Sequence, residues 1–324
     1  MPRHERNKPK LTLEEYKVKT DAEDYGLADE LWDFERFQQK LQMVRVHRED
    51  KKLEFDIIGI PVSVANAIRR IMLSEVPSMA IEKVYIYNNT TIIQDEVLAH
   101  RLGLIPLKAD PRFFEYKSDP NEEGTENDTL EFELKFRCGK KDKDGPSYEK
   151  NYNCYSGQIK WLPKGRQGTL YKEKDIGPIE ADILLAKMRP GHELDLKLLA
   201  VKGIGKDHAK FSPVATAWYR LLPEITLNRE VVGQDAYLLQ KCFSPGVIEV
   251  DKSGKAVVKE ARNDSCSRNV YRYPQIADAV TLSRVRDHFI FTIESVGAME
   301  PEDIFIEAVK VLKKKCLTIL EEIK

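Results

Sequence analysis

The sequence lacks the long apolar runs, the paired cysteines and the excess of charge that mark several large classes of protein. No run of about 18 apolar residues occurs, so we expect no membrane-spanning helix. The five cysteines are scattered and never spaced as Cys-x-x-Cys, which predicts free thiols in a reducing compartment. The formal net charge is −1, so no overall basic field favours nucleic acid. The first residues are charged and polar, and we expect no signal peptide.

Motifs for catalysis, phosphate binding and metal binding are incomplete. The GIGK segment at residues 203–206 resembles a phosphate loop, but that pattern needs glycine and Ser or Thr where this chain has Ala200 and Asp207. The DKDG segment at 142–145 lacks the remaining ligands of a calcium loop. The histidines are isolated, and no nucleophile signature is visible, although a triad assembled in space would not show in the sequence. We therefore expect no catalytic residue, no cofactor and no metal ion.

The most informative stretch that is present is PVSVANAIRRIMLSEVP, residues 61–77. Prolines bracket it and Ser63 is a suitable N-cap residue, so it predicts a helix. Its apolar side chains cover roughly twice the ~100° arc of an ordinary surface helix. One neighbouring sheet cannot cover that arc, which indicates a helix that packs on its own domain and on something else. The alternative is a buried helix with a solvated pair, Arg69 and Arg70, since neither arginine has an acid at i+4.

The hydrophobic patterns predict an α+β protein whose first and last segments form one domain. Residues 43–47 and 53–60 predict a hairpin before the helix, and the alternation around Phe291 predicts a strand before a long helix that starts near Pro301. An isolated hairpin is not stable alone, so we expect a discontinuous domain. The predicted bounds are 1–39 for an N-terminal extension, 40–78 plus 276–324 for the discontinuous domain, and 79–275 for a β-rich insert domain.

Within the insert, periodicity predicts strands and one short helix. Residues 130–137 alternate cleanly and predict a half-buried strand, while 94–103 predict a helix that ends at glycine. Residues 181–188 and 194–201 flank a Pro-Gly turn and predict a hairpin. Further strands are predicted at 80–88, 211–218, 225–232 and 247–250. The N-terminal extension is predicted to be mostly flexible, with its last ten residues docked as a short helix around Trp32, Phe34 and Phe37.

Two cysteines support an alternative function, a ferredoxin-like metal or redox protein. Cys242 precedes Pro-Gly-Val-Ile and is followed by Asp-Ser-Cys at Cys266, a spacing that resembles half of a ferredoxin-like module. An iron–sulfur cluster needs four thiolates and at most two remain, so we favour a retained ferredoxin-like shell with packed cysteines. A third hypothesis, direct nucleic-acid binding through the lysine-rich residues 140–150, is disfavoured by the neutral net charge and the lack of interleaved aromatics.

Three separated parts of the chain resemble the alpha-type subunits of RNA polymerases. They are NAIRRIMLSEVP at 66–77, MAIEKV and QDEVLAHRLGLIPL at 79–84 and 94–107, and VKGIGKDHAKFSPV at 201–214. Within this family the chain is similar to the alpha-like subunits shared by eukaryotic RNA polymerases I and III. Residues 107–114 contain no cysteine, whereas the polymerase II counterpart carries a four-cysteine zinc site there. The aromatic N-terminal extension and the ADPR segment at 109–112 also match the shared subunit.

The resemblance implies an alpha-subunit-like fold, in which a dimerisation domain is split by an insert domain with a ferredoxin-like remnant. It implies a non-catalytic assembly subunit of RNA polymerases I and III, which transcribe ribosomal RNA, 5S rRNA and tRNA, with catalysis on the large subunits. The implied partners are a smaller alpha-like subunit in a heterodimer, the second-largest subunits and a small zinc-binding shared subunit. The implied location is the nucleus, including the nucleolus. We expect no sequence-specific nucleic-acid contact and no membrane contact.

The partner interface is predicted to lie on the two amphipathic helices. The three apolar residues of the first helix are expected to bury against the partner, and those of the C-terminal helix to support the same domain. The arginine pair is expected to face an acidic or carbonyl-rich surface of the larger subunit, a contact that the resemblance implies. The predicted interface residues are Ile68, Arg69, Arg70, Ile71, Met72, Phe305, Leu312 and Ile319.

Overall fold

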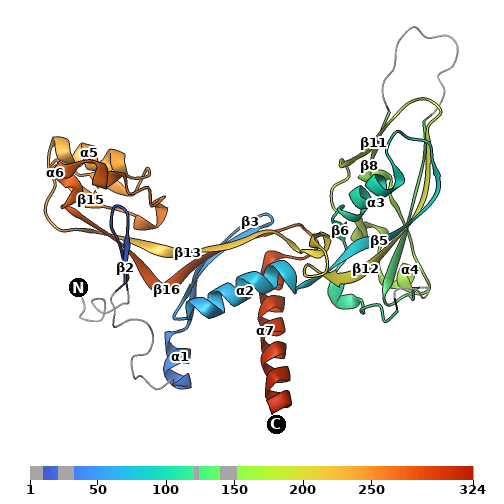
Figure 1. Cartoon of the computed structure of the whole chain (residues 1–324), viewed down its shortest axis with the longest axis horizontal. Helices are drawn as coiled ribbons and strands as arrows, with labels where there is room; N and C mark the ends of the chain where they lie inside the picture. Colours follow the sequence, from blue (N-terminus) through green and yellow to red (C-terminus); the bar gives the residue numbers. More distant parts are fainter. Residues whose placement is uncertain (1–9, 21–32, 120–123, 139–151, 324) are drawn as a thin grey trace, which may run out of the picture. The chain divides into compact units, whose positions relative to one another are not determined.

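The structure is a computed structural model that describes residues 10–20, 33–119, 124–138 and 152–323. The described residues fall into two compact units (Figure 1). The first unit takes its residues from Met1–His47, Glu54–Asn66 and Trp218–Thr292, and the second from Arg48–Leu53, Ala67–Ala217 and Ile293–Lys324. The predicted division into an extension, a discontinuous domain and an insert uses other boundaries and stays a prediction. Trp32, the calcium-like segment 142–145 and the lysine-rich loop 140–150 lie outside the described residues.

A six-stranded sheet runs through the first unit in the order β2-β1-β16-β4-β3, with β13 also paired to β16. Its members are β1 (Lys10–Leu13), β2 (Val18–Thr20), β3 (Gln42–Glu49), β4 (Lys52–Ile58), β13 (Val214–Leu227) and β16 (Val280–Ser295). Strands β3, β4, β13 and β16 continue along the chain into the second unit. Stacked aromatic rings stabilise the sheet: the centroids of Phe55 and Phe291 lie 5.6 Å apart, and Tyr219 contacts the Phe291 ring at 5.3 Å.

The predicted first hairpin is confirmed as β3 and β4, but its turn is shorter than the predicted five residues at 48–52. Asp50 adopts a left-handed conformation with φ of 48°, which lets residues 50 and 51 alone reverse the chain. The helix predicted at the end of the extension is confirmed as α1 (Phe34–Lys40), where the Asp33 side chain accepts a hydrogen bond from the Glu35 amide.

The N-terminal extension also contains a hairpin that the prediction missed. Strand β1 pairs antiparallel with β2 and with residues 282–285 of β16. Leu13 is buried, and its carbonyl accepts a hydrogen bond from the Tyr271 hydroxyl at 2.6 Å. The Arg268 guanidinium donates to the Glu14 carbonyl at 3.0 Å. These long-range partners order a short polar segment whose own composition predicts flexibility.

The remainder of the first unit differs from the predicted run of strands. Its elements are α5 (Gln234–Cys242), β14 (Ile248–Val250), β15 (Ala256–Val258) and α6 (Pro274–Ala277). The predicted strands 211–218 and 225–232 are wrong in their bounds, because one long strand, β13, covers 214–227. Helix α5 was not predicted; it begins after Gly233, whose φ of 63° turns the chain. The predicted strand at 247–250 is confirmed as β14.

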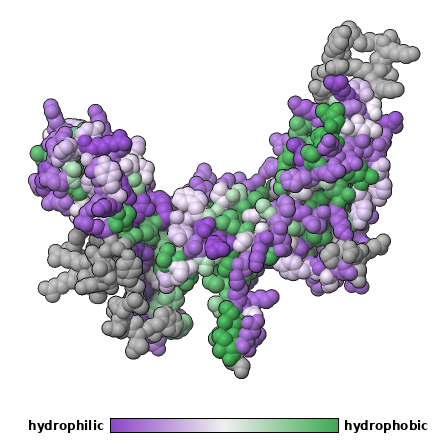
Figure 2. Space-filling model, viewed as in Figure 1, coloured by the Kyte–Doolittle hydropathy of each residue, from purple (hydrophilic) through white to green (hydrophobic). Residues whose placement is uncertain are grey.

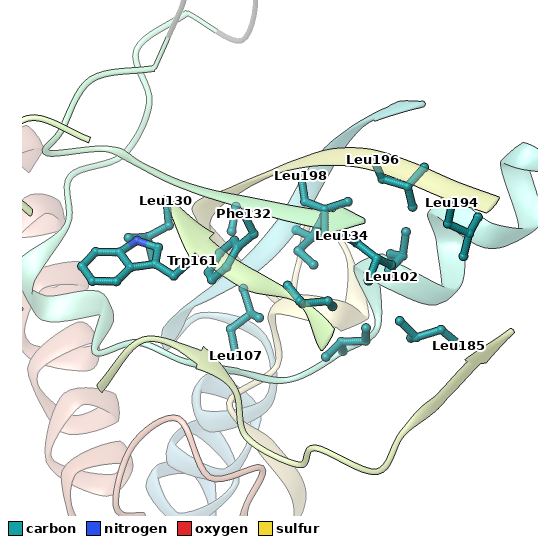
Figure 3. Packing of buried hydrophobic residues seen from close by; sticks show 14 of the residues in the cluster. Leu102, Leu107, Leu130, Phe132, Leu134, Trp161, Leu185, Leu194, Leu196 and Leu198 are labelled. Carbon is teal, nitrogen blue, oxygen red and sulfur yellow. The ribbon is translucent and has the colours of Figure 1, made fainter. Parts of the chain in front are cut away.

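The second unit is built on a four-stranded antiparallel sheet in the order β5-β12-β7-β9. Its strands are β5 (Pro77–Asn89), β7 (Thr129–Arg137), β9 (Lys160–Leu162) and β12 (Glu193–Ile204). Period-two alternation sends one side of each strand into a core that helix α3 (Asp95–Gly103) also enters (Figure 3). The buried side chains include Leu98, Leu102, Leu130, Phe132, Leu134, Leu194, Leu196 and Leu198. The predictions for β5, β7 and α3 are confirmed to within a few residues.

The predicted hairpin of residues 181–188 with 194–201 is wrong. The turn is present, with Gly191 at a φ of 94°, but the strands separate after it. Strand β12 is central and both of its edges are taken by β5 and β7, so β11 (Leu184–Met188) pairs with β8 (Tyr152–Tyr155) instead. The shorter elements are β6 (Leu107–Lys108), β10 (Gly177–Pro178), α4 (Gln167–Leu170), η3 (Pro111–Phe113), η4 (Ser156–Gln158), η5 (Glu173–Asp175), η6 (Ala209–Phe211), η7 (Ala261–Asn263) and η8 (Asn269–Arg272).

Two long helices complete the fold, α2 (Val62–Ser74) and α7 (Pro301–Ile323). Both were predicted, and the mixture of helices with antiparallel sheets confirms the α+β class. Helix α7 begins at a proline followed by Glu302 and Asp303, which suits the helix dipole. Of the helices in the described ranges, none is both long and apolar enough to cross a membrane.

Candidate partner interface

Helix α2 buries most of its apolar arc within this chain. Ile68, Ile71 and Met72 are 6%, 3% and 0% exposed, and Ala65 is fully buried. The predicted N-cap is wrong, because the helix begins at Val62, one residue before Ser63. The Pro61 carbonyl accepts the first hydrogen bonds of the helix, from the backbone amides of Val64 and Ala65, both at 3.1 Å. Most of the wide apolar arc seen in the sequence is therefore covered before any partner is present, while Val64 and Ala67 remain partly exposed.

The predicted interface residues of α2 therefore differ in accessibility: the three apolar residues are buried, and the two arginines are at least partly exposed. Ile68, Ile71 and Met72 offer almost no accessible surface to another molecule, so their contact with a partner stays a prediction. Arg69 is half-buried and Arg70 is exposed. The Ser74 hydroxyl donates back to the Arg70 carbonyl at 2.8 Å, which closes the last turn.

Helix α7, in contrast to α2, is exposed along its C-terminal half. Its first two turns are anchored by buried Pro301, Ile304 and Ala308, and the predicted residues Phe305 and Leu312 are half-buried. Every residue from Lys313 to Ile323 is exposed. The exposed large apolar side chains of the helix are Ile306, Val309, Leu317, Ile319, Leu320 and Ile323.

Most of these side chains share one side of the helix. Val309, Leu312, Cys316, Ile319, Leu320 and Ile323 recur at spacings of three and four residues, which places them in one line. We call this line the α7 stripe, and Figure 2 shows apolar side chains along one side of that part of the helix. Ile319 is 55% exposed and Ile323 is 76% exposed. The described structure thus leaves a contiguous apolar surface uncovered on a well-anchored helix.

Ion pairs within the second unit hold α7 in place. Arg112 contacts Asp303 at 3.1 Å and Asp110 at 2.6 Å, and Arg48 contacts Glu302 at 3.4 Å. The hydrogen bonds that Arg112 donates to the Asp110 carboxylate raise the pKa of Arg112, so this cation stays charged.

A further ion pair joins α7 to the segment that follows α2. The Lys315 ammonium lies 2.8 Å from the Glu75 carboxylate, within the second unit. Sequence reasoning missed this pair, because the two residues are far apart in the chain and the lysine run at 313–315 does not indicate which acidic residue it meets. Lys315 directly precedes Cys316 of the α7 stripe, and the pair is a surface contact that contributes little to holding the helix.

A buried ionic cluster in the first unit fixes the register of β4 and β16. The Asp56 carboxylate is fully buried and lies 2.8 Å from both the His288 ring and the Arg262 guanidinium, and Arg262 also reaches Glu54 at 2.7 Å. Burial alone would lower the pKa of Arg262, but the hydrogen bonds that it donates to Glu54 and Asp56 outweigh the burial, and the pKa is raised. The cluster ties two strands and η7 together, which is a structural role.

The cysteines of the proposed ferredoxin-like remnant are packed. Cys242 is buried, and Cys266 is half-buried with a left-handed φ of 59°. Burial raises the pKa of both thiols, so each favours the protonated form that does not bind metal. Within the part of the chain that the structure describes, no group of three His, Cys, Asp or Glu residues could hold a metal ion.

Comparison with known proteins adds independent findings. The family described as the RNA polymerase Rpb3/Rpb11 dimerisation domain matches residues 54–316. The chain is 51% identical over 309 residues to the human DNA-directed RNA polymerases I and III subunit RPAC1, an overlap of 93% of this chain and 89% of the human protein. The Saccharomyces cerevisiae protein of that name is 46% identical over 298 residues, 89% of each chain. The DNA-directed RNA polymerase subunit Rpo3 of Methanothermobacter thermautotrophicus is 32% identical over 273 residues, 84% of this chain and 95% of the archaeal one.

Proposed function

This chain belongs to the family of the RNA polymerase Rpb3/Rpb11 dimerisation domain, and from that premise we propose that it is a non-catalytic assembly subunit shared by RNA polymerases I and III. Relatives named as subunits of both polymerases, at 46% and 51% identity over most of the chain, support this assignment. Catalysis belongs to the large subunits. The chain contributes a platform on which they assemble, for the synthesis of ribosomal RNA, 5S rRNA and tRNA.

The single observation that carries the proposal is the α7 stripe. A contiguous apolar surface on an anchored helix is unusual for a monomer and typical of an association site. Covering four half-exposed Leu and Ile side chains contributes on the order of 4 kcal/mol, because fully burying one such side chain contributes about 1.5–3 kcal/mol. The occupant that we propose is a helix of the smaller alpha-like subunit, which would pack its own apolar stripe against Leu312, Ile319 and Ile323 in a heterodimer.

The buried face of α2 has a supporting role in this proposal. Ile68, Ile71 and Met72 position the helix, and Phe305 lies in the anchored first part of α7, between the buried residues Ile304 and Ala308. Arg69 and Arg70 are proposed to meet an acidic or carbonyl-rich surface of a second-largest subunit. A small zinc-binding shared subunit is proposed as a further neighbour. The chain would act in the nucleus, including the nucleolus.

Co-expression with the smaller alpha-like subunit, followed by size-exclusion chromatography and mass measurement, tests the proposal. We expect a stable one-to-one heterodimer, and we expect Leu320→Asp to abolish it because a carboxylate would be buried in the interface. Thr318→Asp is the matched control, since Thr318 lies on the other side of the exposed helix and should leave the heterodimer intact. A heterodimer that forms equally well with both variants would remove the α7 stripe from the interface.

The ferredoxin-like redox alternative has no observation in its favour. Cys242 and Cys266 have raised thiol pKa values, and no third metal-binding side chain joins them among the described residues. Iron in stoichiometric amount and visible absorbance in the purified chain would be needed to revive it.

A further inference from the structure

One edge of strand β16, at residues 282–285, is closed by a segment from the other end of the chain. Strand β1 pairs antiparallel with it at four positions, from Lys10 to Leu13. The hairpin of β1 and β2, residues 10–20, is drawn in dark blue in Figure 1. The hairpin and this part of β16 both belong to the first unit. Neither belongs to the predicted partner interface or to the α7 stripe.

A single side chain anchors the hairpin in the core of the first unit. Leu13 is 6% exposed and packs in the apolar cluster that also contains Leu282. Leu11 is half-buried, and Val18 and Tyr16 are 50% and 85% exposed. Among the described side chains of the hairpin, only that of Leu13 enters the cluster. Apolar burial therefore holds the hairpin at one point.

Further contacts reach the main chain of the hairpin. The Tyr271 hydroxyl donates to the Leu13 carbonyl at 2.6 Å. The Arg268 guanidinium donates to the Glu14 carbonyl at 3.0 Å and to the Glu15 carbonyl at 3.4 Å. The ladder with β16 is also made by backbone groups. Because main-chain contacts do not depend on the side chains of the bound segment, these groups recognise an extended backbone with one aliphatic anchor.

The residues that receive the hairpin are held in place by contacts of their own. Val270, in η8 beside Tyr271, is fully buried in the core of the first unit. The Ser267 hydroxyl donates to the Cys242 carbonyl at the end of α5, at 3.4 Å. Strand β16 is also paired with β13. None of these contacts involves the hairpin, so the receiving residues keep their arrangement when it leaves.

The backbone that presents the Arg268 guanidinium is strained. Arg268 has a φ of 56° and Cys266 a φ of 59°, a left-handed region that side chains other than glycine rarely adopt. The Cys266 amide donates to the Asp264 carboxylate at 3.0 Å, which supports this turn. Such conformations persist where the surrounding structure determines them, and they are common at sites that hold a ligand. The turn is thus built to place one cation against the hairpin carbonyls.

We propose that β16 residues 282–285, with Tyr271 and Arg268, form a strand-acceptor site and that the N-terminal hairpin is its exchangeable occupant. The hairpin undocks as a unit while the site stays folded. An extended segment with an aliphatic anchor can then pair with β16 in its place. A two-stranded hairpin is not stable alone in water, so the released residues lose their own pairing as well.

The contrast with β4 explains why the hairpin exchanges. Both strands pair with β16, but β4 buries Phe55 and Ile57, which are 1% and 3% exposed, whereas β1 buries Leu13 alone. Segments with few buried apolar contacts open locally at a lower free energy than the core does. Strand β1 therefore leaves the sheet while β4 and the rest of β16 remain in it.

A labelled peptide tests the proposal on the full chain. The probe is a fluorescein-labelled peptide of residues 10–20, and the site is vacated by Leu13→Asp, which would place a carboxylate in the apolar cluster. Fluorescence anisotropy should show saturable binding to this variant, the opened chain. Binding to the wild-type chain should be at least tenfold weaker, because the resident hairpin competes at a high effective concentration.

Peptide and protein variants locate the binding. A peptide with Leu13→Ser should bind the opened chain at least tenfold more weakly, whereas Tyr16→Ser, at an exposed position, is the matched control and should bind equally. Tyr271→Phe in the opened chain should weaken binding about fivefold by removing one hydrogen bond. Tyr237→Phe, on the exposed surface of α5, is its control and should have no effect.

Hydrogen–deuterium exchange of the wild-type chain needs no vacated site and decides the matter if the opened chain does not fold. Residues 11–13 should exchange at least tenfold faster than residues 54–57 of β4, and Tyr271→Phe should speed exchange at 11–13 alone. No saturable peptide binding to the folded opened chain, equal binding of the Leu13→Ser peptide, or exchange at 11–13 as slow as at 54–57 would overturn the proposal and make the hairpin a permanent part of the sheet.

Discussion

Helices α2 and α7 carry apolar faces of similar character, yet the chain covers only one of them. The α2 face is closed, with Ile71 and Met72 at 3% and 0% exposure, whereas the α7 stripe is open, with Ile319 at 55%. The difference shows that apolar periodicity predicts which face of a helix is covered. It does not say whether the same chain or another molecule covers that face. We infer that α2 is a component of this chain's own fold and that α7 holds the energy of association.

The largest expected effect separates the two helices by stability. Ile71→Asp should destabilise the isolated chain by about 5 kcal/mol, because it removes a core side chain and buries a carboxylate without a partner. Chemical denaturation of the chain alone measures this. The same substitution at Ile319 should leave the unfolding midpoint nearly unchanged. Equal stability of the two variants would show that the α2 face is not a core.

A second contrast extends the comparison from apolar groups to charges. Arg262→Met should cost about 3 kcal/mol of folding stability, since it leaves the fully buried Asp56 carboxylate without its guanidinium. Arg45→Met is the matched control, because Arg45 meets Glu260 at 3.7 Å on the surface and should contribute less than about 1 kcal/mol. Urea denaturation of both variants checks the prediction, and similar losses would contradict the structural role given to the Asp56 cluster.

A smaller effect should appear only in association. Ile319→Ala should weaken the heterodimer about fivefold, as expected for removing a half-exposed side chain from an interface. The thermal midpoint of the isolated chain should not move. The dissociation constants are measured by binding the wild-type and Ile319→Ala chains to surface-immobilised partner subunit. A shift in the thermal midpoint without a change in affinity would show that Ile319 stabilises the chain's own fold and does not belong to the interface.

The smallest predicted effect concerns the ion pair beside the α7 stripe. Lys315→Ala should cost at most about 0.5 kcal/mol of stability, because Lys315 is solvent-exposed where it meets Glu75. Its effect should fall further in high salt, as surface charges are screened. Differential scanning calorimetry at low and high salt can resolve this; a large, salt-independent loss would mean that the pair is more buried than the structure shows.

The predictions that were confirmed depend on local patterns in the sequence. The α3 helix, the β7 strand and the start of α7 at Pro301 each depend on neighbouring residues in the sequence, and periodicity therefore identifies them. The β1–β2 hairpin was missed because its order depends on β16 and Tyr271, more than 250 residues away. The same reason explains the pairing of β11 with β8 and not with β12: the edges of a central strand are assigned by the whole sheet.

The candidate interface shows the same limit. The wheel of α2 indicated an arc too wide for one neighbour, but it could not distinguish a neighbour in the same chain from one in another. For α7, the recurrence of Leu312, Cys316 and Ile319 indicated a face, and only the structure shows that this face is left uncovered beyond Leu312. Glu75 and Lys315 gave no signal at all, because an ion pair across 240 residues leaves no local pattern.

Hydrogen–deuterium exchange of this chain, alone and with the smaller alpha-like subunit, tests the central claim most directly. The exposed half of α7, residues 313–323, should exchange quickly alone and become protected in the heterodimer. The buried part of α2, residues 65–72, should be protected in both states. Protection that appears only at 65–72 on heterodimer formation, with 313–323 unchanged, would contradict the assignment of α7 as the surface of association.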